Sequence, residues 1–109
     1  MEKYLKIFKA LGDKTRLRIV LMLRVKPMCV CEIREIIGFS MSTVSNHLKI
    51  IKEAGIITSE KKDKFINYQL NTEDFTIREI LKILSEINNE KIVENDARKA
   101  LVTDRVNIC

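Results

Sequence analysis

The 109-residue sequence predicts a mainly α-helical fold that carries one small β-hairpin. Apolar residues recur with helical spacing over most of the chain, whereas residues 57–70 favour two strands, and the second of these alternates in the strand pattern. The three glycines and the single proline fall where helices are expected to end. A chain of this length builds one hydrophobic core, so we expect a single domain over residues 1–109.

The first two helices are predicted from apolar spacing and from the residues at their ends. One face of the first helix carries Tyr4, Leu5, Phe8 and Leu11. Gly12 follows, a residue that tolerates a left-handed backbone at a helix end. Asp13 is suited to cap the second helix, over about residues 14–24. Because this helix is apolar around most of its circumference, we expect it at the centre of the core.

A helix-turn-helix is predicted over about residues 30–55. Its first helix spans residues 30–37, and a tight turn through Gly38 leads to Ser40, a suitable cap for the next helix. In that second helix the core side carries Val44, Leu48 and Ile51, and Gly55 marks its end. The opposite side and its flanks carry polar residues, most of them short hydrogen-bonding groups or cations, namely Ser42, Thr43, Ser45, Asn46, Lys49, Lys52 and the anionic Glu53.

A hairpin is predicted over about residues 56–70, with strands at residues 57–61 and 65–70. Its tip, Lys61-Lys62-Asp63-Lys64, projects three cations that can grip phosphate, although an ordinary solvated tip has the same composition. The predicted order is three helices, a recognition helix, a β-hairpin and a terminal helix. This is the order of a winged helix-turn-helix, in which the hairpin is the wing.

Residues 72–109 are expected to form a C-terminal dimerisation helix and tail. Asn71 or Thr72 can cap a helix whose apolar stripe comprises Ile77, Ile80, Leu81, Leu84 and Ile87. A weaker helical pattern follows, and the polar tail over residues 102–109 is expected to fray without a ligand. The apolar stripes of the first and fifth helices exceed what one small core can cover, which favours a homodimer.

Composition and charge indicate a soluble protein with polyanionic partners. The chain is 46% hydrophobic and 32% charged, and its net charge is +5. We expect a cytoplasmic protein, because the N-terminus lacks a signal-peptide pattern and no apolar run approaches the ~20 residues that span a membrane. Three cysteines are an odd number, so we expect reduced thiols rather than a disulfide framework.

These features predict binding to double-stranded DNA. A helix fits the major groove, and a two-fold dimer would place two such helices on a pseudo-palindromic operator. The candidate DNA-binding residues are Ser42, Thr43, Ser45, Asn46, His47, Lys49, Lys61, Lys62 and Lys64. His47 lies beside the core face, so packing or a phosphate contact suits it better than metal binding.

Four segments together resemble the ArsR/SmtB family of metal- and metalloid-responsive repressors. They are the opening signature FKALGDKTRLRI at residues 8–19, MCVCEI at 28–33, SMSTVSNHL at 40–48 and EAGII at 53–57. The resemblance covers about residues 4–87. It implies a homodimeric repressor that leaves its operator when an ion or another inducer binds.

The thiols of Cys29 and Cys31 are the candidate inducer ligands. They stand at the entrance to the helix that positions the recognition helix, and soft thiolates suit thiophilic ions. The resemblance implies As(III) or Sb(III), with Cd(II) or Pb(II) as further options, and no organic cofactor. The arsenic-sensing pattern has a third cysteine where this chain has Arg34, so Cys109 is the candidate third ligand.

Other interpretations remain open at this point. The two neighbouring cysteines fit simple packing at a helix start, and Cys109 fits a bystander. A thiol-redox or persulfide-responsive repressor would use the same three cysteines. A zinc or nickel site on the fifth helix would need histidines, and the single histidine lies elsewhere. We expect no enzyme, since the chain has no phosphate-binding glycine loop and no Cys-x-x-Cys motif.

Overall fold

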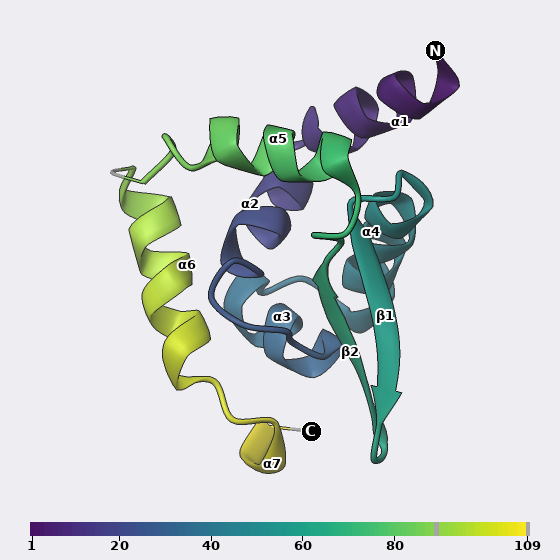
Figure 1. Ribbon diagram of the computed structural model, residues 1–109. Helices are drawn as coiled ribbons and strands as arrows, with labels where there is room; N and C mark the ends of the chain where they lie inside the picture. The colour runs from purple at the N-terminus through teal and green to yellow at the C-terminus, as the bar shows by residue number, and fades with distance from the viewer. Residues whose placement is uncertain (89, 109) are drawn as a thin grey trace.

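The computed structural model describes residues 1–88 and 90–108 of the chain. It confirms a mainly α-helical fold with one β-hairpin (Figure 1). In chain order the elements are α1 (Glu2–Leu11), α2 (Lys14–Met22), α3 (Val30–Ile37), α4 (Met41–Glu53), β1 (Ile57–Lys62), β2 (Phe65–Leu70), α5 (Phe75–Leu84), α6 (Lys91–Val102) and α7 (Arg105–Ile108).

The hydrophobic core surrounds α2, as its apolar circumference predicts. Ile19 and Val20 of this helix are fully buried, and α1, α4 and α6 all pack against it. The core continues through Ile33 of α3, Leu48 of α4 and Ile77 of α5. In Figure 1 α5 crosses the top of the molecule, α6 descends along one side, and the hairpin descends along the other. No helix of the described chain is long and apolar enough to cross a membrane.

Two of the predicted helix caps are confirmed. Asp13 accepts a hydrogen bond from the backbone N–H of Arg16 at 3.0 Å, and this bond lowers the pKa of the Asp13 carboxyl. Ser40 accepts one from the backbone N–H of Thr43 at 3.2 Å and so begins α4.

One predicted cap is wrong, and one helix end is as predicted but closes in a different conformation. The fifth helix is capped by Asp74, which accepts from the backbone N–H of Ile77 at 3.2 Å, and not by Asn71 or Thr72. The Asn71 side chain instead donates to the carbonyl of Gly55 at 2.9 Å, just before the wing, so it is not available to cap α5. Gly12 closes α1 as predicted, donating its backbone N–H to the carbonyl of Phe8, but with φ −76° it does so without the left-handed backbone that glycine tolerates.

The wing is an antiparallel pair, β1 with β2, in the register Ile57↔Leu70 to Lys62↔Phe65. A two-residue turn joins the strands, and Asp63 in it adopts φ 57°, a left-handed conformation that aspartate tolerates better than most residues. β2 also pairs with the chain just before α3. Met28 N donates to Tyr68 O at 3.1 Å, and Tyr68 N donates to Met28 O at 2.8 Å. The wing is therefore fastened to the residue that precedes Cys29.

The C-terminal segment packs more closely than its sequence predicts. α6 lies against α2 and α3, and Arg18 makes a two-point ion pair with buried Asp96 at 2.9 and 3.0 Å. Residues 105–108, expected to fray, form α7 beside α3. The Lys26 ammonium holds the junction by donating to the carbonyl of Thr103 at 3.1 Å.

Candidate DNA interface and cysteine site

The predicted recognition helix, α4, presents its polar side to solvent. Val44, Leu48 and Ile51 are buried against the core, and the opposite face is exposed. Gly38, with φ 89°, provides the sharp turn between α3 and α4. The exposed candidates for DNA contact on α4 are Ser42, Thr43, Ser45, Asn46 and Lys49.

Some of these polar groups already have partners within the protein. The hydroxyls of Ser42 and Thr43 lie 3.2 and 2.9 Å from that of Ser40, so the helix start is a connected hydroxyl cluster. Lys52 donates to the Ser59 hydroxyl of β1 at 2.6 Å and thereby ties the recognition helix to the wing. The two elements expected to touch DNA are therefore linked at their surfaces.

His47 occupies a different place from the other candidates on α4. It is half-buried, and its Nδ1 lies 3.3 Å from Nη1 of Arg16. Arg16 also donates to the carbonyl of Ala10 at 2.9 Å, so it joins the end of α1 to the recognition helix. This geometry supports a packing role for His47, which its position beside the core face indicated. A phosphate contact through its other nitrogen stays a prediction.

The wing tip places its cations in solvent, as predicted. Lys61, Lys62 and Lys64 are all exposed around the turn. The Lys64 ammonium lies 5.5 Å from the centre of the Phe65 ring, close enough for a cation–π contact. Binding of these three lysines to phosphate stays a prediction.

Cys29 and Cys31 lie where the backbone enters α3. Cys29 is the N-cap residue, with φ −87° and ψ 169°, and it is only 2% exposed. Cys31 lies in the first helical turn and is half-buried. The backbone at Cys29 is therefore extended, and the helix begins only at Val30. Cys31 is disulfide-bonded in this structure, which contradicts the expectation of reduced thiols at this residue, whereas Cys29 forms no disulfide.

One cavity brings the cysteines together with both predicted DNA-binding elements. It encloses about 500 Å³ at the junction of α3, α4 and the wing. Its walls include Cys29, Val30 and Cys31 at the start of α3, Ser45 of α4, and Lys64, Phe65, Ile66 and Tyr68 of the wing. A group bound to the cysteines would therefore adjoin the side chains that are candidates for DNA contact.

Residues 13–59 match the family model described as "Bacterial regulatory protein, arsR family". The chain is 33% identical over 110 residues to the "Arsenical resistance operon repressor" of Escherichia coli (strain K12), a match that covers 96% of this chain and 94% of the relative. The chain belongs to the arsR family. It is a DNA-binding transcriptional repressor, because this family consists of transcriptional regulators rather than enzymes.

Two further comparisons concern the helix-turn-helix fold. The "Uncharacterized HTH-type transcriptional regulator MJ1325" of Methanocaldococcus jannaschii is 41% identical over 91 residues, covering 80% of this chain and all of that one. The "homodimeric winged helix-turn-helix DNA-binding domain" Mb0332 of Mycobacterium bovis has a TM-score of 0.71 at 20% identity, over 83% of this chain and 82% of that chain. The latter match confirms the winged helix-turn-helix fold.

The third thiol proposed for this arsR-family chain, Cys109, lies outside the described residues. Among residues 1–88 and 90–108, no group of three or more His, Cys, Asp or Glu side chains is arranged to hold a metal ion. The described donors are the two sulfurs at the start of α3.

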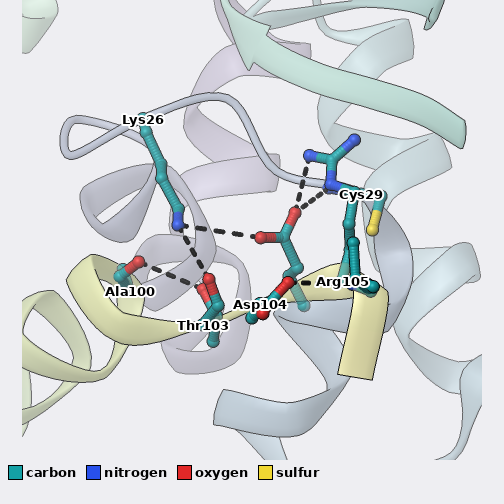
Figure 2. A network of polar contacts seen from close by, with 8 residues as sticks. Lys26, Cys29, Ala100, Thr103, Asp104 and Arg105 are labelled. Carbon is teal, nitrogen blue, oxygen red and sulfur yellow. Dashed lines mark hydrogen bonds and ion pairs between the residues drawn. The ribbon is translucent and has the colours of Figure 1, made fainter. Parts of the chain in front are cut away.

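Sequence reasoning missed a charged network that adjoins the cysteines (Figure 2). Glu32 accepts a hydrogen bond from the backbone N–H of Cys29 at 3.0 Å, and Arg105 donates to the same carboxylate at 2.8 Å. Lys26 approaches its other oxygen at 3.7 Å. The first contact has a sequence signal, since a glutamate three residues after an N-cap is typical of a capping box. The contact with Arg105 joins residues 73 positions apart and has no local signal.

Proposed function

We propose that this arsR-family repressor leaves its operator when a thiophilic ion binds the thiolates of Cys29 and Cys31. Arsenite is the favoured inducer and antimonite the next, with Cd(II) and Pb(II) as alternatives. Cys109 is proposed as the third ligand, because trivalent arsenic favours three sulfur ligands. The proposed place of action is the cytoplasm.

The observation that carries this proposal is the shared cavity. Soft sulfur ligands select thiophilic ions, and both cysteines at the start of α3 line the same cavity as Ser45 and Lys64. An ion bound there lies next to the recognition helix and the wing at once. Its effect on DNA binding then needs no long-range pathway.

The backbone around the cysteines supports a direct route from ligand to wing. Met28 precedes Cys29 and exchanges two hydrogen bonds with Tyr68 of β2. An ion that draws the two sulfurs together turns the Cys29 backbone, and Met28 moves with it. Because Tyr68 is bonded to Met28, β2 follows and the wing changes its angle to α4. Both sulfurs must be thiolates for this step, so the disulfide at Cys31 has to be reduced first.

We propose a homodimer built on α1 and α5, acting on a pseudo-palindromic operator. Phe8 of α1 is 63% exposed, and Phe75 and Ile83 of α5 are 67% and 68% exposed. Large apolar side chains that are this exposed favour burial against a second copy of the chain. Lys3 of α1 pairs with Asp74, the N-cap of α5, at 3.2 Å, which links the two helices at their ends.

The experiment is a titration of operator release, measured by fluorescence anisotropy with protein reduced by a thiol-free phosphine. We expect release in the order arsenite, antimonite, then cadmium or lead, with zinc inactive. Cys29→Ser and Cys31→Ser should each keep operator affinity and lose release by arsenite. Arsenite release from either variant equal to that of the unmodified chain would refute the ligand assignment.

The role of Cys109 needs its own variant. If its thiol is the third ligand, Cys109→Ser should weaken arsenite-driven release at least tenfold, or about 1.4 kcal/mol. X-ray absorption should then show two sulfur neighbours and one lighter atom in place of three sulfurs. Three sulfurs and an unchanged titration would show that Cys109 is a bystander.

A second candidate is a thiol-redox repressor, which the disulfide at Cys31 favours. Oxidation of two thiols to a disulfide releases two electrons and two protons, and hydrogen peroxide takes them up as it forms water. Release of the operator by peroxide, reversed by phosphine, with no response of the reduced protein to arsenite, would favour this candidate. Mass spectrometry distinguishes them, because the redox response leaves a covalent change at sulfur.

A further inference from the structure

The side chain of Arg105 lies between the start of α3 and the wing. Its Nη2 donates to Oε1 of Glu32 at 2.8 Å, and its guanidinium carbon lies 4.9 Å from the centre of the Phe65 ring. Figure 2 shows the guanidinium beside Cys29, at the end of a chain of polar contacts that begins at Lys26. One residue of the C-terminal segment therefore touches both the cysteine-bearing element and β2.

The Glu32 end of this contact is sensitive to the position of Cys29. The Glu32 side chain is 3% exposed, and a buried carboxylate is stable only with close partners. Its Oε1 accepts from both the Cys29 backbone and Arg105, while Lys26 faces Oε2. If Cys29 turns, Oε1 loses one of its two donors, and the carboxylate must reorient around the remaining cations.

The Phe65 end of the contact belongs to the wing. Phe65 begins β2, lines the cysteine cavity, and carries the Lys64 ammonium near the same ring. A guanidinium over the ring fixes the ring's orientation through cation–π attraction. The position of Arg105 therefore bears on the strand end where the phosphate-binding tip starts.

We infer that Arg105 is a positioning residue that couples the cysteine cavity to the wing. Glu32 holds the guanidinium over Phe65 in the DNA-binding form. When Cys29 turns toward an ion, the Glu32 carboxylate shifts, Arg105 follows it, and Phe65 and Lys64 lose their support. The ion-dependent half of this inference rests on the proposed function, whereas the contact between Arg105 and the wing does not.

The decisive test is hydrogen exchange at the wing amides, residues 60–66, in the ligand-free full chain. Arg105→Gln should raise these exchange rates at least fivefold, because the wing loses the contact between Arg105 and the Phe65 ring that stabilises it. Arg105→Lys keeps the charge and should stay within about twofold of the unmodified chain. Arg98→Gln removes an exposed arginine of α6 and should change nothing at the wing. Unchanged wing exchange in Arg105→Gln would overturn the inference, as would an equal rise in α2, since that indicates general destabilisation.

A second measurement tests the coupling itself. The ratio of operator affinities without and with arsenite should fall at least tenfold in Arg105→Gln, while its arsenite affinity, followed by thiolate-to-arsenic absorption, stays unchanged. Phe65→Leu should show the same loss, and the double variant should lose no more than either single one. Additive losses would overturn the relay through the ring. If arsenite fails to release the unmodified chain, the proposed function fails, and the exchange measurement still decides the inference.

Discussion

Neutralising the wing lysines should flatten the salt dependence of operator binding by a calculable amount. Lys61 and Lys62 are successive strand residues, so their side chains point to opposite faces of the hairpin, and Lys64 lies in the turn. We therefore expect about two phosphate contacts per wing and about four per dimer. Each contact contributes about 0.9 to the slope of log affinity against log salt, so the slope should fall by about 3.6 in the triple Gln variant.

The assay is fluorescence anisotropy with a labelled operator at salt concentrations from about 50 to 200 mM. Over that fourfold range, a slope difference of about 3.6 means that the unmodified chain loses ~150-fold more affinity than the variant. The matched control replaces Lys91, Arg98 and Lys99, three exposed cations of α6, with Gln. Equal slopes for the wing variant and the unmodified chain, or an equal change in the control, would refute the assignment of phosphate binding to the wing.

Three further predictions follow from the recognition helix, a buried ion pair and a helix cap. Asn46→Ala should cost about 1–3 kcal/mol at the operator and much less on random DNA, and equal losses on both in competition assays would rule out base readout there. Asp96→Ala should lower the free energy of unfolding by about 3–5 kcal/mol in urea, because Arg18 keeps a largely buried charge without its partner; a loss below about 1 kcal/mol would contradict this. Asp13→Ala should cost about 1 kcal/mol at pH 7, and the difference should shrink at pH 3. The backbone N–H of Arg16 lowers the folded-state pKa of Asp13, so its contribution is present above the ordinary carboxyl pKa and is lost as the pH falls through the lowered one; a difference independent of pH would refute that cause.

Local sequence signals predict the helix-turn-helix and the wing well, because their boundaries depend on neighbouring residues. α3 begins and ends where its apolar pattern and Gly38 place it, and Ser40 caps α4 through a bond to the third residue after it. The polar face of α4 is exposed, since the 3.6-residue period places it opposite the buried residues.

The signals fail where a distant contact decides the local structure. Asparagine is a common N-cap residue, but the Asn71 amide donates a hydrogen bond to the carbonyl of Gly55, 16 residues earlier. Asp74 caps α5 instead. The tail forms α7 because Lys26 and Glu32 hold Thr103 and Arg105, contacts that no periodic pattern contains. The pairing of His47 with Arg16 likewise joins two helices. The ligand roles of the cysteines stay predictions for the same reason, since they depend on a third group that α3 does not supply.

The central claim is that ion binding at Cys29 and Cys31 and operator binding oppose each other. Thermodynamic linkage requires that the factor by which arsenite weakens operator affinity equals the factor by which operator weakens arsenite affinity. The most direct measurement is therefore arsenite affinity of the reduced protein, free and saturated with operator, followed by thiolate-to-arsenic absorption. We expect weaker arsenite binding to the operator complex, by the same factor as the measured loss of operator affinity. Equal arsenite affinity for the free protein and the complex would contradict it.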